Sequence, residues 1–88
     1  MRQLLLDSQA IEDLKWWIKQ DKRVALKIIE LLENLPLEPL TGKGKPEALK
    51  YGLSGFWSRR ITQEHRLVYE VTETYVRVVS CRYHYRPE

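Results

Sequence analysis

The chain has 88 residues, enough for one domain spanning 1–88, and a hydrophobic content of 43% with three tryptophans can supply one modest core. With a charged fraction of 31%, the chain is neither membrane-like nor depleted enough in apolar residues to be disordered. No apolar run approaches the roughly 20 residues that span a bilayer, so we expect no membrane association. The single cysteine, Cys81, excludes an intramolecular disulfide. Without a signal-peptide pattern at the N-terminus, we therefore expect a cytoplasmic protein.

The net charge of +3 is unevenly distributed along the chain. Residues 1–42 carry six Lys/Arg against seven Asp/Glu, whereas residues 43–86 carry nine against four. A basic half favours a polyanionic partner, of which nucleic acid is the commonest. An ordinary solvated surface explains the charge equally well, so charge alone does not decide the function.

The N-terminal half predicts a short strand followed by two helices. Residues 2–6 are apolar, and Asp7 or Ser8 can cap the first helix, because a side-chain oxygen there accepts from free amides of the first turn. Asp21 is placed to cap the second helix, which Pro36 ends. The expected apolar stripes are Ile11, Leu14, Trp17 and Ile18 in the first helix, and Val24, Ile28, Leu31, Leu32 and Leu35 in the second. Helices joined this closely form a helical hairpin.

The C-terminal half changes from loop to strands. Residues 36–55 hold all four glycines and three of the four prolines, which predicts a loop with one helical turn at residues 47–50. From there on apolar residues alternate, which predicts strands at 56–61, 66–72 and 76–85. Helices followed by an antiparallel meander indicate an α+β domain in which the helices cover one sheet face.

Several kinds of chemistry have no support in the sequence. It contains neither a phosphate-binding Gly-x-x-x-x-Gly-Lys-Ser/Thr run nor a Gly-x-Gly-x-x-Gly fingerprint, so we expect no nucleotide cofactor. Two histidines and one cysteine cannot form a zinc site at the usual spacings, so we expect no metal. Cys81 and His84, three residues apart on a strand, would point to opposite faces and so make a poor nucleophile pair.

RNA cleavage without a metal fits the remaining residues. RNA carries its own nucleophile, the 2′-hydroxyl, so a protein needs a base, a guanidinium and an acid around one phosphate. Glu47, Arg66 and His84 are candidates for these three tasks. Candidates for holding phosphates are Lys50, Arg59, Arg60 and Arg82, and candidates for stacking on bases are Trp57, Tyr83 and Tyr85.

Each of these residues also has an ordinary structural explanation. His84 can be a surface histidine, Glu47 a solvated partner of neighbouring lysines, and Arg66 an ion-pair partner of Glu64 or Glu70. From the residues alone, a non-catalytic RNA-binding or DNA-binding module is as compatible as a ribonuclease. A DNA-binding repressor is disfavoured, since neither expected helix carries the exposed Arg, Asn and Gln of a recognition helix.

Three segments carry a resemblance to a known family. They are GKGKPEALK at 42–50, LSGFWSRRITQEHRLVY at 53–69 and CRYHY at 81–85, and the run DKR at 21–23 agrees with them. Together they resemble the YoeB/Txe family of toxins in the RelE superfamily. The resemblance covers nearly the whole chain, and a collinear match of this length is far more specific than a short motif.

The resemblance implies a fold and a reaction. Members of this family fold as a helical hairpin on a curved antiparallel sheet, enter the ribosomal A site as dimers and cut mRNA there by 2′-hydroxyl attack. By motif, Glu47 resembles the general base, His84 the general acid and Arg66 the group that stabilises the phosphorane. Tyr85 resembles a residue that orients the substrate, and Lys50 and Arg60 resemble residues that hold the RNA backbone.

The resemblance also implies partners. They are the ribosome and its mRNA, a second copy of the toxin, and a YefM-like antitoxin whose tail wraps the toxin. Operator DNA would be bound only through the antitoxin. Relatives usually stop near the tyrosine matching Tyr85, whereas residues 86–88 follow here, and we expect them to leave the site open.

Overall fold

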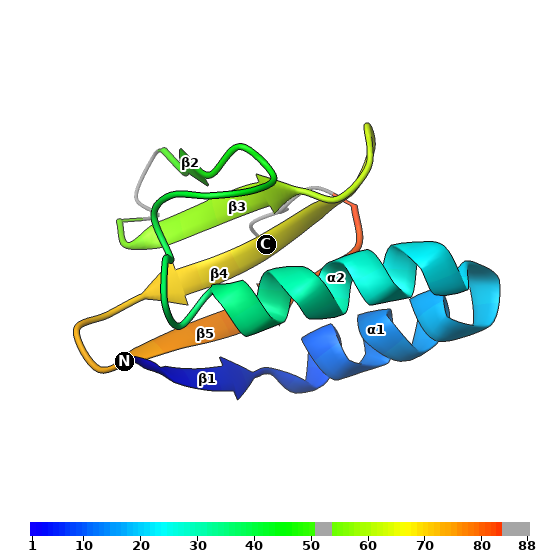
Figure 1. The fold of residues 1–88 in the computed structure, drawn as a ribbon, viewed down its shortest axis with the longest axis horizontal. Helices are drawn as coiled ribbons and strands as arrows, with labels where there is room; N and C mark the ends of the chain where they lie inside the picture. The colour runs from blue at the N-terminus through cyan, green and yellow to red at the C-terminus, as the bar shows by residue number, and fades with distance from the viewer. Residues whose placement is uncertain (51–53, 84–88) are drawn as a thin grey trace.

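The computed structural model describes residues 1–50 and 54–83. Its elements in chain order are β1 Gln3–Leu6, α1 Ser8–Gln20, α2 Lys22–Asn34, β2 Glu47–Ala48, β3 Phe56–Arg60, β4 Arg66–Val71 and β5 Tyr75–Ser80. The strands form one sheet in the order β1-β5-β4-β3-β2, in which β1 runs parallel to β5 and every other pair is antiparallel (Figure 1). The predicted α+β class and the meander β3–β4–β5 are confirmed.

The helical hairpin supplies half of the core. Asp21 caps α2 as predicted, because its carboxylate accepts from the amides of Arg23 and Val24. The α2 stripe is buried at Ile28, Leu31, Leu32 and Leu35. Among the described residues, neither helix is long and apolar enough to cross a membrane.

The buried stripe of α1 differs from the prediction. Ile11 and Ile18 are each 45% exposed, and the buried positions are Ala10, Asp13 and Trp17. Asp13 is buried because its carboxylate accepts hydrogen bonds from the Gln9 side chain and from the Cys81 amide. Helical periodicity predicts the buried face from the spacing of apolar residues, so it could not predict a buried carboxylate.

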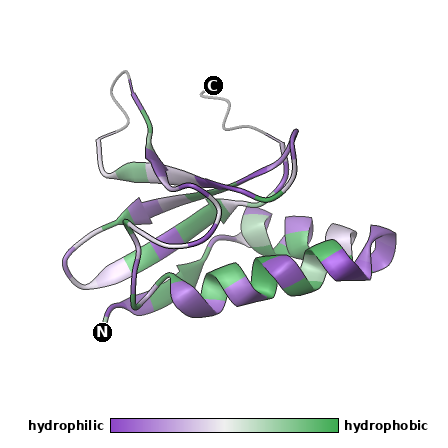
Figure 2. Cartoon of the chain, turned by 45° about the horizontal axis from the view of Figure 1, so that its top comes forward, coloured by the Kyte–Doolittle hydropathy of each residue, from purple (hydrophilic) through white to green (hydrophobic). Residues whose placement is uncertain are grey.

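The two sheet faces have different environments. Side chains alternate along a strand, and cross-strand partners share a face. The register Arg59↔Leu67 and Trp57↔Tyr69 places these four residues on the face that packs against the helices. Ser58, Arg60 and Arg66 therefore lie on the opposite face. Figure 2 shows the helices gathered on one side of the sheet, which leaves the other side free of helices.

The expected helical turn at 47–50 is wrong. Glu47 and Ala48 instead form the short edge strand β2, paired with Ser58 and Trp57, and the Leu49 amide continues the ladder to the Phe56 carbonyl at 2.9 Å. Four residues are too few to repay the cost of nucleating a helix, whereas the edge of β3 offers free backbone groups.

The last strand is shorter than expected, since β5 ends at Ser80 and residues 81–83 form a bend. Val68 pairs with Ser80 while Tyr69 pairs with Val78, so Val79 is an extra residue and the ladder is irregular there. Beyond this bulge, the backbone amide and carbonyl of Cys81 form hydrogen bonds with side chains of α1 and not with a strand. Residues 84 and 85, the end of the expected strand, lie outside the described residues.

Candidate active site

Three of the predicted site residues lie on one sheet face. Glu47 on β2 pairs with Ser58 on β3, and Arg60, two residues further along β3, pairs with Arg66 on β4. Glu47, Arg60 and Arg66 therefore share the face opposite to the helices, on three adjacent strands. Two strand spacings and two residues separate Glu47 from Arg66, about 12 Å between Cα atoms, and long side chains can converge on one phosphate across that span.

Two arginines face each other across this surface. Arg60 and Arg66 are direct cross-strand partners, and like charges in such a pair are destabilising. Within residues 1–50 and 54–83, neither side chain forms a salt bridge with an acidic residue. The Arg66 guanidinium donates through Nη1 to the carbonyls of Thr62 and His65, at 2.8 and 3.0 Å. A cationic pair of this kind is suited to an anion such as a phosphate.

Glu47 and Lys50 are both exposed at the edge of the sheet. Glu47 is held by the pairing of β2 with β3, and Lys50 lies two residues beyond the end of β2. Gly44 fixes the approach to β2, because its carbonyl accepts from the Arg60 amide at 2.6 Å. Its φ is +87°, and a Cβ there would lie 3.1 Å from the Arg60 carbonyl oxygen.

The C-terminal segment meets the start of β4. The Arg66 amide donates to the Tyr83 carbonyl at 3.0 Å, and the Tyr83 amide donates to Nδ1 of His65 at 2.8 Å. The residue that precedes His84 is thus hydrogen-bonded to Arg66 itself. His84 and Tyr85, predicted as general acid and orienting residue, lie outside the described residues.

Arg59 is a structural residue, so the prediction that it contacts phosphates is wrong. Its side chain is fully buried, and its guanidinium donates to the Tyr69 hydroxyl, the Asn34 side chain and three loop carbonyls. Those carbonyls belong to Glu38, Thr41 and Lys43. Five donors are thereby used, and Arg59 holds the loop between α2 and β2 against the sheet. The Tyr69 hydroxyl donates onward to Pro39, and burial raises the pKa of Tyr69 although the Arg59 hydrogen bond lowers it.

Arg82 lies against α1. Its guanidinium carbon is 3.6 Å from the centroid of the Trp16 ring, a cation–π contact, and 5.0 Å from that of Tyr83. The stacking candidates Trp57 and Tyr83 differ in exposure, since Trp57 packs against the core while Tyr83 is 45% exposed. Tyr83 is therefore accessible at the surface, Arg82 is half-buried against Trp16, and Trp57 belongs to the fold.

Cys81 is unsuited to nucleophilic chemistry for a reason other than strand parity. The thiol is buried and donates to the Ala10 carbonyl at 3.6 Å. Burial, assisted by the nearby Asp13 carboxylate, raises its pKa to about 12. The reactive thiolate is therefore scarce at neutral pH. Among residues 1–50 and 54–83, no group of three or more His, Cys, Asp or Glu side chains is arranged to hold a metal ion.

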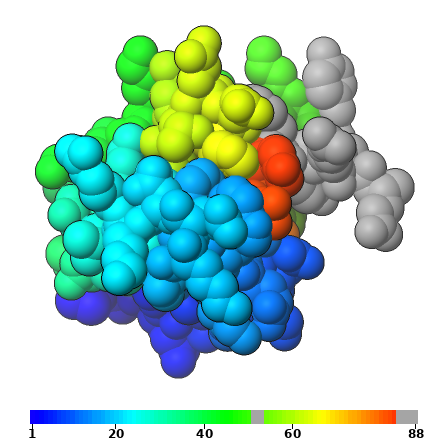
Figure 3. All heavy atoms as spheres, turned by 90° about the vertical axis from the view of Figure 1, so that its right-hand side faces the viewer, coloured from blue at the N-terminus to red at the C-terminus, as the bar shows by residue number. Residues whose placement is uncertain are grey.

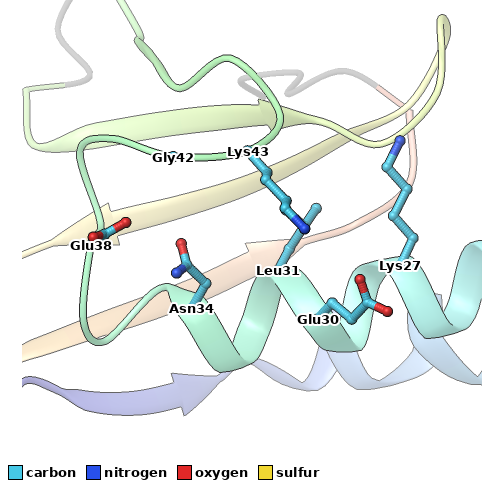
Figure 4. Close-up of a pocket in the computed structure, with 7 residues that line it drawn as sticks. All are labelled: Lys27, Glu30, Leu31, Asn34, Glu38, Gly42 and Lys43. Carbon is cyan, nitrogen blue, oxygen red and sulfur yellow. The ribbon is translucent and has the colours of Figure 1, made fainter.

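A separate hollow of about 390 Å³ lies between α2 and the loop at 38–43 (Figure 4). Its lining combines charges of both signs: Lys27, Glu30, Leu31, Asn34, Glu38, Gly42 and Lys43. The Lys27 ammonium is engaged by the Ile61 carbonyl at 2.6 Å. None of the predicted site residues lines this hollow.

Sequence reasoning missed three side chains next to the C-terminal segment. Asp13, Trp17 and His65 all contact residues 81–83. The available signal was that His65 is one of only two histidines and directly precedes Arg66. Nothing in the sequence indicated that the Asp13 carboxylate, four residues before Trp17 in the helix, is buried.

Comparison with known proteins identifies this arrangement. The sequence profile of the YoeB-like toxins of bacterial type II toxin–antitoxin systems matches residues 6–85. Toxin YoeB of Escherichia coli K12 is 51% identical over 82 residues, which cover 93% of this chain and 98% of that protein. The sequence match and the α+β fold therefore define a small toxin of a type II toxin–antitoxin system. The chain belongs to the YoeB-like toxin family.

Solved structures agree with this assignment. The YoeB dimer from Staphylococcus aureus is 45% identical, with a TM-score of 0.84 and coverage of 96% of this chain and 98% of that one. YoeB in the YoeB-YefM complex from the same organism is 43% identical, with a TM-score of 0.80 and coverage of 97% and 99%. The predicted hairpin-on-sheet fold is confirmed by both.

Proposed function

We propose that this toxin is an endoribonuclease that cuts mRNA in the ribosomal A site by attack of the 2′-hydroxyl on the adjacent phosphate. The observation that supports it best is the placement of Glu47, Arg60 and Arg66 on one sheet face, with the backbone of the residue before His84 hydrogen-bonded to Arg66. An acid–base reaction at a phosphate needs such a set of groups, because a proton must be removed, charge stabilised and a leaving group protonated.

Each residue has one task in this proposal. Glu47, exposed on β2, takes the proton from the 2′-hydroxyl. Arg66 donates to the equatorial oxygens of the pentacovalent dianion, for which its planar guanidinium is suited. His84 protonates the departing 5′-oxygen, and Tyr85 orients the substrate.

The RNA strand is held by cations around this centre. Arg60 lies directly opposite Arg66, and Lys50 follows the strand that carries Glu47. Both are exposed and can bind the flanking phosphates. Arg82, on the α1 side of Tyr83, is a peripheral phosphate contact, and the exposed Tyr83 ring offers a stacking surface.

The proposal includes partners. Relatives form a YoeB dimer and a YoeB-YefM complex, so we propose that this toxin forms a homodimer and binds a YefM-like antitoxin. The complex would bind operator DNA through the antitoxin. Large apolar side chains remain exposed on both helices, at Ile11, Ile18 and Leu26, which favours a protein partner there. A ribosome-dependent nuclease acts in the cytoplasm.

The products of cleavage test the chemistry. Attack by the 2′-hydroxyl leaves a 2′,3′-cyclic phosphate and a 5′-hydroxyl, and replacing that hydroxyl with hydrogen at the cut site abolishes cleavage. Product ends are identified by mass spectrometry after cleavage of mRNA on programmed ribosomes. A 5′-phosphate product contradicts the proposal, since it requires attack by an activated water.

A non-catalytic RNA-binding module is the second candidate, supported by the same basic surface. In that case RNA affinity would survive the loss of Glu47 and His84, because phosphate attraction rests on lysines and arginines, and no cleavage would be observed with the wild-type protein.

A further inference from the structure

The backbone of Cys81 is held on both sides by α1. The Asp13 carboxylate accepts from the Cys81 amide at 3.0 Å, and the Trp17 indole donates to the Cys81 carbonyl at 2.8 Å. Asp13 and Trp17 are four residues apart, so they lie on the same face of the helix. Both are 5% exposed. The chain is therefore fixed at the point where β5 ends, two residues after the bulge at Val79.

The backbone of Tyr83 is held through its amide and its carbonyl by the two residues where β4 begins. Its amide donates to Nδ1 of His65 and its carbonyl accepts from the Arg66 amide. Tyr83 has a φ of +61°, a left-handed conformation that is unfavourable for a residue with a side chain. The two hydrogen bonds offset that cost and keep the bend in one conformation.

The His65 ring connects these two anchors. It meets the Trp17 ring edge-on, with centroids 4.8 Å apart, and it lies 4.9 Å from the Tyr83 ring. Since Nδ1 accepts a hydrogen bond, the neutral ring carries its proton on Nε2. Figure 3 shows the orange-red atoms of the segment at 81–83 between the blue atoms of α1 and the yellow atoms of the turn at 62–66.

The geometry points to a positioning clamp, made by Asp13, Trp17 and His65, that holds residues 81–83 at the start of β4 and so fixes the backbone to which the proposed acid, His84, is attached. The inference deepens the proposed function and rests on it, because positioning matters only if His84 is the general acid. A reaction that depends on an acid placed within hydrogen-bond reach is sensitive to a shift of about 1 Å, which can cost on the order of 100-fold in rate. None of the three side chains needs to touch RNA.

His65 allows the hydrogen bond to be separated from packing. His65→Phe keeps an aromatic ring against Trp17 and Tyr83 but removes the acceptor, whereas His65→Asn places a carbonyl oxygen near the position of Nδ1. We expect His65→Phe to lower the single-turnover cleavage rate on ribosomes by roughly 10- to 100-fold with ribosome affinity unchanged. We expect His65→Asn to recover most of the rate.

The matched control is Ile28→Val, a fully buried core change in α2 away from the clamp. It lowers the melting temperature but is expected to cut at the wild-type rate below its unfolding transition. If His65→Phe cuts at the wild-type rate, or His65→Asn is as slow as His65→Phe, the clamp is overturned.

Amide hydrogen exchange tests the clamp without relying on activity. In the wild-type protein the Cys81 and Tyr83 amides should be protected. His65→Phe should remove protection at Tyr83 and leave it at Cys81. An unprotected Tyr83 amide in the wild-type protein overturns the clamp even if RNA is cut. Conversely, a wild-type protein with protected amides that cuts no ribosome-bound RNA overturns the proposed function.

Discussion

Arg59 and Arg60 are neighbours with opposite environments. Alternation along β3 turns Arg59 toward the helices, where five hydrogen bonds hold it, and turns Arg60 toward the exposed face beside Arg66. The two residues are chemically identical, so their type could not indicate which one is structural. Only the register of β3 against β4, and the acceptors that the 38–43 loop brings to Arg59, distinguish them.

Substituting these two arginines should affect different properties. Arg59→Ala leaves several buried acceptors without a donor at about 1–3 kcal/mol each, so we expect the free energy of unfolding to fall by at least about 3 kcal/mol. Arg60→Ala should leave stability nearly unchanged and weaken RNA binding, with a reduced salt dependence. Urea denaturation and RNA binding at several salt concentrations measure the two effects. Equal loss of stability in both variants would contradict the assignment.

Substituting the proposed catalytic residues should lower the cleavage rate and leave ribosome binding nearly unchanged. General acid–base groups typically contribute about 10²- to 10⁴-fold each, so Glu47→Ala and His84→Ala should slow single-turnover cleavage by factors in that range. Arg66→Ala should slow it most, and Arg66→Lys should restore only part, because an ammonium lacks the planar fork. Ribosome binding is measured in parallel. Wild-type rates for both Glu47→Ala and His84→Ala would show that other groups perform the proton transfers.

At the scale of elements, patterns with a strong local cause were predictable. The Asp21 cap, the α2 stripe and the three long strands follow from capping and from period-two alternation, and all are observed. The strand β2 and the early end of β5 were not predictable, because distant partners determine them. The first depends on the free edge of β3, and the second on side chains of α1 some 60 residues earlier in the chain, as with the Trp17–Cys81 hydrogen bond.

The helix caps offer a direct test of this local physics. Asp21→Ala removes the acceptor for two amides of the first turn of α2, and we expect the free energy of unfolding to fall by about 1 kcal/mol. Asp7 and Ser8 were both candidate caps for α1, but the N-cap residue is Asp7 and its side chain makes no cap hydrogen bond. Ser8→Ala is therefore the control and should change stability little. Both are measured by urea denaturation, and equal effects would refute the capping assignment.

At the scale of the whole molecule, the site depends on contacts between distant parts of the chain. Glu47 comes from the sheet edge, Arg60 and Arg66 from the meander, and residues 81–83 from beyond β5, where α1 fixes them. Sequence reasoning could nominate acids, bases and cations by type. It could not establish which of them share a face, since that requires the strand register. Asp13 and His65 were missed for the same reason, as each acts through the backbone of a remote segment.

This arrangement also bears on why the ribosome should be needed. The proposed site includes Glu47, Lys50 and Arg60, which are exposed at the edge and end of the sheet, and its cations can attract any polyanion by charge. In-line attack by a 2′-hydroxyl needs a nearly linear geometry, which a flexible single strand rarely adopts, and an exposed face does little to impose it. A ribosome that holds the message in a fixed conformation would supply that constraint. We therefore expect single-turnover cleavage of ribosome-bound mRNA to exceed that of the same free RNA by several orders of magnitude, an effect that orientation of the reacting groups can produce. The comparison uses one message with and without ribosomes, at toxin concentrations that saturate binding to each, so that affinity does not enter. Equal rates on the two substrates would place the geometric constraint within the toxin and remove the ribosome from the mechanism.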